Sequence, residues 1–114
     1  MWRSLRILGL VGAVSCGTKT LEPLPLEIGV AASRTTAAPG ESVDFLVTAQ
    51  GDNLAGLNVA YGDNNADQFA TGGARTARVT FHHAFGAAGT YEVRATVTDA
   101  DANEKSATVQ IHVP

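Results

Sequence analysis

Apolar side chains alternate with polar or small ones along most of this chain, from Leu26 almost to the last residue. The run 91–98 (YEVRATVT) is the clearest case, since every second residue in it is apolar or aromatic. Successive side chains of a β-strand point to opposite faces, so a period of two places the apolar side chains on one face. The pattern therefore predicts short strands with one buried face, and it shows no amphipathic helix.

Seven such runs follow one another at a spacing of roughly ten residues, and turn-favouring Gly, Asn, Asp or Pro residues separate them. This organisation is typical of an all-β, immunoglobulin-like β-sandwich of about seven antiparallel strands. We expect one such domain over 26–114. The expected strands are 26–30, 42–49, 57–61, 68–71, 77–81, 91–98 and 107–113.

The residues before this domain have the order of an export signal. Arg3 and Arg6 precede the apolar run 7–14 (ILGLVGAV), and small residues follow it, so we expect a signal peptide over 1–15. A transmembrane anchor would need about 20 apolar residues. The polar residues that follow Cys16 end the run well before that length.

Cys16 is the only cysteine of the sequence, so it has no partner for a disulfide within the chain. Residues 13–16 (AVSC) resemble the lipobox of bacterial lipoproteins, in which a peptidase cuts before a cysteine that carries a diacylglyceryl thioether. Ala13 stands where Leu is usual, and Ala13 with Ser15 also suits an ordinary signal peptidase that cuts at the same bond. We expect a lipid on Cys16 that holds the protein at a membrane, with plain secretion as the alternative.

Residues 16–25 are expected to be this lipid-bearing cysteine and a short tether. Pro23 and Pro25 disfavour both helix and central strand. Gly17 takes the place of the Asp that marks retention at the inner membrane of enteric bacteria. The resemblance to lipoproteins therefore implies the outer membrane or cell surface rather than the inner membrane.

The charge balance bears on possible partners. The chain has 8 Lys+Arg against 11 Asp+Glu, and two of these cations, Arg3 and Arg6, lie in the expected signal peptide. Nucleic acids are bound through a basic surface, which the exported part lacks. We expect no nucleic-acid partner.

Two segments of the chain carry a more specific pattern. Residues 59–64 (VAYGDN) resemble the W-D-F-G-D-G segment of PKD domains, and residues 83–93 (HAFGAAGTYEV) are similar to the H-x-Y-x-x-x-G-x-Y-x-V segment of the same family. Val59 replaces the usual Trp, Ala60 the following Asp, and Asn64 the final Gly. The resemblance extends from about Leu26 to Val113 and implies a spacer or interaction module of extracellular proteins. The residues on the motif positions are Tyr61, Gly62, Asp63, His83, Phe85, Gly89 and Tyr91.

Elementary chemistry assigns structural roles to these residues. Gly62 and Asp63 let the chain leave a strand sharply, and the Asp63 carboxylate can accept N–H groups of the turn. Gly89 provides a corner before Tyr91. We expect the Tyr91 ring to be buried and its hydroxyl to find a backbone partner.

Histidines and carboxylates are the candidate metal ligands. His82 and His83 are neighbours in a strand, so they point to opposite faces and cannot share one ion, and His112 lies on the outer face of the last strand. We expect no zinc site. Asp99 and Asp101 lie in an oxygen-rich loop of the kind that some PKD and cadherin-like domains use for Ca²⁺. We expect a solvated turn there, with Asp99 and Asp101 as weak Ca²⁺ candidates and with 51–53 and 63–65 as similar loops.

The sequence shows no nucleophile beside a base, and no glycine-rich phosphate loop in its usual context. We therefore expect no enzyme and no cofactor. The leading hypothesis is a non-catalytic cell-envelope lipoprotein whose single PKD-like domain contacts an envelope or extracellular protein. A carbohydrate-binding accessory module is the alternative. It is less favoured because alternation places most aromatic rings in the core and leaves only Phe69 available.

Overall fold

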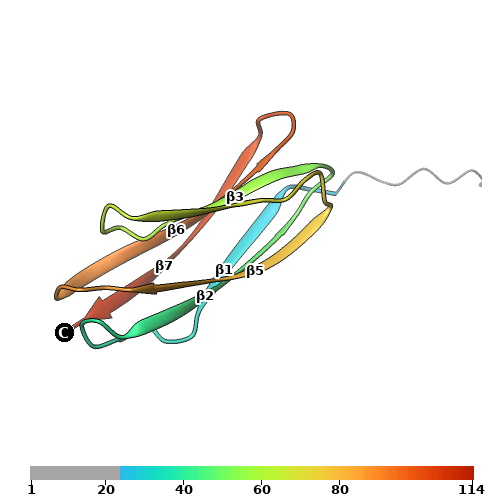
Figure 1. Ribbon diagram of the computed structural model, residues 1–114. Coiled ribbons are helices and arrows are strands. Elements are labelled where there is room, and N and C mark those ends of the chain that lie inside the picture. The colour runs from blue at the N-terminus through green and yellow to red at the C-terminus, as the bar shows by residue number, and fades with distance from the viewer. Residues whose placement is uncertain (1–23) are drawn as a thin grey trace, which may run out of the picture.

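Seven β-strands and no helix make up the part of the chain that the computed structural model describes, residues 24–114 (Figure 1). The predicted all-β class and the predicted number of strands are both confirmed. Each expected run overlaps one strand, and the bounds differ by up to three residues. β3 begins three residues before the expected run and ends before Tyr61, and β4 begins two residues early. The strands are β1 (Glu27–Ala32), β2 (Ser42–Gln50), β3 (Leu54–Ala60), β4 (Ala66–Ala70), β5 (Thr76–Ala84), β6 (Gly89–Asp99) and β7 (Glu104–Val113).

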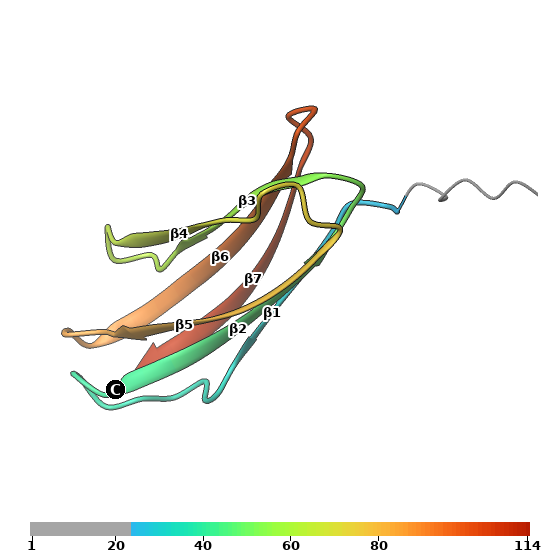
Figure 2. The same cartoon turned by 45° about the vertical axis from the view of Figure 1, so that its right-hand side comes forward.

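The strands form two antiparallel sheets that lie face to face (Figure 2). One sheet has the order β1-β2-β5, and the other has the order β4-β3-β6-β7. On one side of the sandwich a bridge between Thr36 and His112 brings the segment after β1 against β7. On the other side β4 and β5 are edge strands that do not pair with each other. This is the predicted immunoglobulin-like arrangement.

The core follows the period-two pattern closely. In β2, Val43, Phe45 and Val47 are fully buried, while the residues between them are exposed or half-buried. In β6, Val93 and Val97 are buried in the same way. Each buried face removes apolar surface from water, which is the main force that holds the two sheets together.

The chain enters and leaves the sandwich at opposite ends. Leu24 lies beside the β2–β3 connection, where its N–H donates to Asp52, and the carboxyl terminus lies at the opposite end (Figure 1). The turn between β3 and β4 lies at the carboxyl-terminal end, together with the connection from β5 to β6. Among the described residues, no helix is long and apolar enough to cross a membrane.

Candidate functional site

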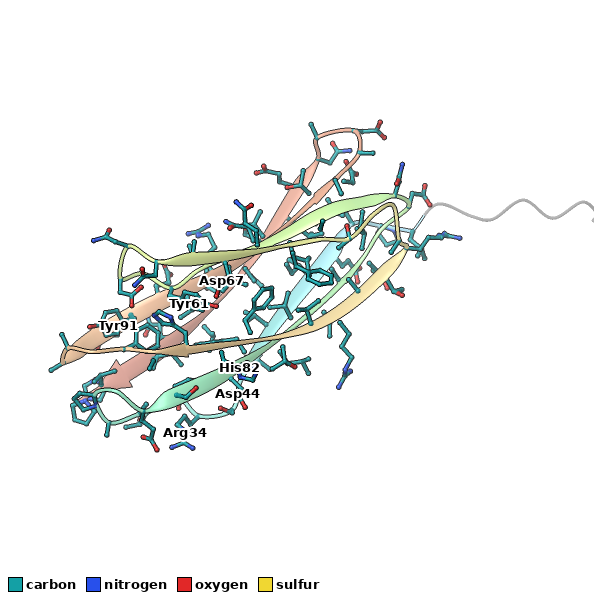
Figure 3. All side chains as sticks on the ribbon, in the orientation of Figure 1. Arg34, Asp44, Tyr61, Asp67, His82 and Tyr91 are labelled. Carbon is teal, nitrogen blue, oxygen red and sulfur yellow. The ribbon has the colours of Figure 1, made fainter. Side chains whose placement is uncertain are left out.

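The PKD-like motif residues meet at the carboxyl-terminal end of the sandwich. Tyr61 directly follows β3, His83 lies near the end of β5, and Tyr91 lies near the start of β6. Figure 3 shows Tyr61 and Tyr91 at this end, near Asp67 of β4. Two sequence segments that are about 20 residues apart therefore form one cluster, which we call the motif cluster. Its members are Tyr61, Gly62, Asp63, Asp67, His83, Phe85, Gly89 and Tyr91.

Tyr61 and His83 form the centre of the motif cluster. Their ring centroids are 3.9 Å apart and their planes differ by 5°, so the two rings are stacked. The Tyr61 side chain is buried, with 1% of its surface exposed. Phe85 meets the His83 ring edge-on at 4.8 Å. Edge-on and stacked pairs are the favoured geometries of aromatic rings, so this packing stabilises the end of the core.

A carboxylate holds His83 from the opposite sheet. The Asp63 Oδ2 atom lies 2.6 Å from His83 Nε2, and only 18% and 15% of the two side chains are exposed. Because an ionised carboxylate only accepts hydrogen bonds, Nε2 carries the proton in this contact. Burial alone would raise the pKa of Asp63, but hydrogen bonds from His83 and Asn65 outweigh it, so the pKa lies below its ordinary value.

The Tyr61 hydroxyl donates a hydrogen bond to Asp67 Oδ2 at 2.7 Å. Burial and the neighbouring Asp67 and Asp63 carboxylates raise the pKa of Tyr61 well above its ordinary value, so this hydroxyl keeps its proton. Sequence reasoning missed Asp67. The signal that points to it is the buried Tyr61 itself, because a buried hydroxyl needs a partner and the β3–β4 hairpin places Asp67 opposite Val59.

Tyr91 differs from the prediction in one respect. Its ring is only partly buried, because it packs at the margin of the core, 4.5 Å from the ring of Phe85. Its hydroxyl donates to the Ala87 carbonyl at 2.6 Å, which is the backbone partner that we expected. Gly89 has a φ of 153°, a conformation that side chains rarely adopt, and it brings the chain from Ala87 back to Tyr91.

Position 62 requires glycine, both because of its backbone conformation and because neighbouring atoms leave no room for a side chain. Its φ is 84°, and an added Cβ would lie 2.8 Å from the Glu92 carbonyl oxygen. The neighbouring Asn64 also has a positive φ, 72°, which Asn tolerates better than most residues. The β3–β4 turn therefore passes directly over β6, and this places Asp63 against His83.

In the candidate Ca²⁺ loops, the Asp99 and Asp52 carboxylates accept hydrogen bonds from neighbouring residues. Asp99 Oδ1 accepts the N–H groups of Asp101 and Asn103, both at 2.9 Å, and Asp99 Oδ2 accepts the Asn103 side-chain amide at 3.1 Å. These bonds, the Asn103 amide first, lower the pKa of Asp99. Asp52 accepts a bond from Arg75. Within residues 24–114 there is no group of three or more His, Cys, Asp or Glu side chains placed to hold a metal ion.

The other histidines lie away from the motif cluster. His82 points to the outer face of the three-stranded sheet, where its Nδ1 lies 2.6 Å from Asp44 (Figure 3). His83 points inward, so the two neighbours diverge as alternation predicts. His112 is exposed on β7. The predictions for residues 1–23, including the signal peptide and the lipid on Cys16, concern residues outside the described part of the chain.

Comparison with known proteins identifies the family. A model of the PKD domain matches residues 27–113. The chain belongs to the PKD domain family. This confirms the resemblance that the two motif segments predicted. No curated protein matches the chain.

Solved structures support the same fold. The PKD domain of an M14-like peptidase from Thermoplasmatales archaeon SCGC AB-540-F20 is similar, with a TM-score of 0.70 and 22% identity over 82% of this chain and 97% of that one. The PKD domain of the human receptor SorCS2 has a TM-score of 0.53 and 19% identity over 90% and 89%. A CARDB domain from Pyrococcus furiosus, in complex with di-metal ions, has a TM-score of 0.59 and 16% identity over 83% and 97%.

PKD domains are a common extracellular interaction module and are generally non-catalytic. In this PKD domain, the polar groups of the motif cluster bond to one another or to the backbone. Asp63 and His83 satisfy each other, as do Tyr61 and Asp67, and Tyr91 bonds to the backbone. The Asp63–His83 contact therefore joins the two sheets, and the Tyr61–Asp67 bond stabilises the β3–β4 hairpin within one sheet.

Proposed function

We propose that this protein is a non-catalytic cell-envelope lipoprotein whose PKD domain makes protein contacts, or serves as a structural module, at the membrane surface. Cys16 carries the anchoring part of the proposal. It is the only cysteine in the sequence, and it directly follows a basic and apolar segment of export-signal type. A single cysteine cannot form a disulfide within the chain, whereas a diacylglyceryl thioether would account for its presence.

The position of the termini supports a surface role. A lipid on Cys16 would attach the domain to the membrane from the Leu24 end of the sandwich. The motif cluster and the carboxyl terminus lie at the other end (Figure 1). Both outer sheet faces then remain accessible from the side. Because Gly17, and not the Asp that marks inner-membrane retention in enteric lipoproteins, follows Cys16, we propose the outer membrane or cell surface.

The position of the polar side chains of the motif cluster supports a role in protein contacts. The polar side chains of the motif cluster bond within the domain. We therefore propose that a partner protein binds to the outer sheet faces or to the edge strands. Families of β-sandwich domains carry different functions on the same fold, so the surface of this chain decides its partner.

Carbohydrate binding is a second candidate, and Phe69 favours it. Phe69 is the exposed large hydrophobic side chain among the described residues, with 46% of its surface accessible. It borders a shallow hollow of about 290 Å³ that Asn58, Gln68 and Thr98 also line. A single ring beside amide and hydroxyl groups offers one stacking position for a sugar.

Intact-mass measurement of the protein from envelope membranes tests the anchor. We expect the mass of a chain that begins at Cys16 and carries a lipid, and we expect Cys16→Ser to release a folded protein into the soluble envelope fraction. A mature chain with a free Cys16 thiol would refute lipidation. Loss of glycan binding in Phe69→Ala, with protein cross-links unchanged, would favour the carbohydrate candidate.

A further inference from the structure

The outer face of the β1-β2-β5 sheet is hollowed along its length. Two adjoining hollows of about 470 and 420 Å³ lie on this face, and Arg78 of β5 lines both. The surface dips because Gly29 and Ala31 of β1 carry little or no side chain. We call this surface, which runs from Glu27 past Arg78 to Thr80, the Arg78 groove.

Strand register divides the Arg78 groove into three rows of side chains. Each row crosses β1, β2 and β5 in turn, and neighbouring rows are two residues apart along each strand. The three rows are Glu27–Gln50–Thr76, Gly29–Thr48–Arg78 and Ala31–Leu46–Thr80. The three rows are thus acidic at Glu27, basic at Arg78 and apolar at Leu46. Asp44 lines the groove beyond Leu46, where its carboxylate contacts His82.

Arg78 differs from the other arginines of the described domain. Arg34, Arg75 and Arg94 each lie within ion-pair distance of a carboxylate, from Glu41, Asp52 and Glu92 respectively. Arg78 has neither an ion pair nor a side-chain hydrogen bond within residues 24–114, although carboxylates outnumber cations in the domain. Its guanidinium offers five N–H donors in a planar fork that matches a carboxylate.

We propose that the Arg78 groove binds an extended segment of a partner protein that presents a carboxylate to Arg78. An extended chain repeats its side-chain direction every two residues, as the rows do. The segment therefore places a basic side chain opposite Glu27, an acidic one opposite Arg78 and an apolar one opposite Leu46. This inference rests on the proposed function, for which it names the surface and the chemistry of the partner.

The lining of the groove favours a peptide over other ligands. No aromatic ring lines either hollow, so a sugar has nothing to stack on. One cation beside Glu27 is too little for nucleic acid, which needs several phosphate contacts. The hydroxyls of Thr48, Thr76 and Thr80 can bond to the amide groups of an extended backbone. An extended peptide with a basic and an acidic side chain two residues apart therefore complements Glu27 and Arg78.

Titration of the isotope-labelled protein with the synthetic peptide acetyl-TKTETLT-amide, followed by amide chemical shifts, tests the inference. We expect saturable shifts at Thr48, Arg78 and Thr80, which weaken at 0.5 M NaCl because salt screens exposed charges. The charge-swapped peptide acetyl-TETKTLT-amide should bind several-fold more weakly. Arg78→Gln should weaken the first peptide about five- to tenfold, and Arg78→Glu should prefer the swapped one.

Lys105→Gln is the matched control. Lys105 is also exposed and without a carboxylate partner in the described domain, but it lies on β7 of the other sheet. The variant removes the same charge, so it should bind the first peptide as the unmodified protein does. Equal losses in the two variants would mean a general charge effect and would overturn the inference.

The outcomes also separate this inference from the proposed function. Absence of saturable shifts on this face with either peptide at millimolar concentration refutes the groove. If cross-links to envelope proteins then map to another surface, the proposed function stands. If Phe69→Ala abolishes glycan binding while no protein cross-links form, the contact function itself is wrong.

Discussion

Asp63 and His83 connect the two sheets of the sandwich through a contact of 2.6 Å between Oδ2 and Nε2. His83 belongs to β5 of the three-stranded sheet, and Asp63 belongs to the turn that follows β3 of the four-stranded sheet. No backbone pairing joins β4 and β5 on this side. The side-chain contact therefore fastens an edge that the sheets leave open.

The Asp63 contact predicts a stability loss in acid. The pKa of Asp63 is lower in the folded protein than its ordinary value of 3.8. The contact therefore stabilises the fold fully above pH 3.8, and this contribution is lost as the pH falls through the folded pKa. Asp63→Asn should lower the free energy of unfolding by about 1.5–3 kcal/mol at pH 6 and should flatten its decline between pH 5 and pH 2.5. Urea unfolding at a series of pH values measures both effects.

Asp44→Asn provides the control for this prediction. Asp44 contacts His82 at the same distance, 2.6 Å, but both side chains are more than half exposed. An exposed ion pair contributes about 0–1 kcal/mol, so this variant should lose much less. Equal losses in the two variants would show that the burial of the Asp63 contact does not matter.

Gly62→Ala should be strongly destabilising. The methyl group would lie 2.8 Å from the Glu92 carbonyl, in addition to the cost of a positive φ. Gly40→Ala isolates the two effects, because Gly40 has nearly the same φ, 81°, with nothing within 4 Å of the added carbon. We expect about 1–2 kcal/mol for Gly40→Ala and at least about 1 kcal/mol more for Gly62→Ala, measured by thermal unfolding. Equal costs would mean that the turn shifts freely away from β6.

The sequence was sufficient to predict most of the strands because they bury a single face. β4 is the exception, since all five of its residues are exposed. In β2, Val43, Phe45 and Val47 alternate with Ser42, Asp44, Leu46 and Thr48, and this pattern predicts that the first three share the buried face, as the structure shows. The motif also predicted a turn at Gly62, because this glycine directly follows the alternating run 57–61 and precedes Asp63 and Asn64. Both signals are local, so they survive in a single sequence.

The pairing of side chains across the sandwich was not predictable in the same way. The sequence indicated Asp63 and His83 separately, but their contact depends on how two sheets are placed relative to each other. Asp67 was missed because its partner, Tyr61, lies across a hairpin whose register the sequence does not state. Tyr91 was expected to be buried from its alternation with Val93, yet the strand begins at the margin of the core.

Tyr91→Ala should destabilise the domain through lost packing on Phe85. A buried aromatic ring typically costs about 3–5 kcal/mol when it is truncated to Ala, and the partial burial of Tyr91 places the expected loss at or below the lower end of this range. Tyr91→Phe removes only the bond to the Ala87 carbonyl and should cost about 0.5–1.5 kcal/mol. Phe69→Ala, at an exposed site, should cost less than Tyr91→Ala. Unchanged melting of Tyr91→Ala with loss of partner binding would make Tyr91 a contact residue.

Calcium should leave the stability of the domain unchanged. The Asp99 carboxylate already accepts three hydrogen bonds from its own turn, so an ion would have to replace them. A ligand at 100 times its Kd would add about 2.7 kcal/mol, which thermal unfolding detects readily. We expect no shift of the melting temperature in millimolar Ca²⁺. Asp101→Ala is the informative variant, because the Asp101 side chain takes no part in the hydrogen bonds to Asp99, whereas Asp99→Ala would break the turn itself. A rise in melting temperature with Ca²⁺ that disappears in Asp101→Ala would show that this loop is a calcium site.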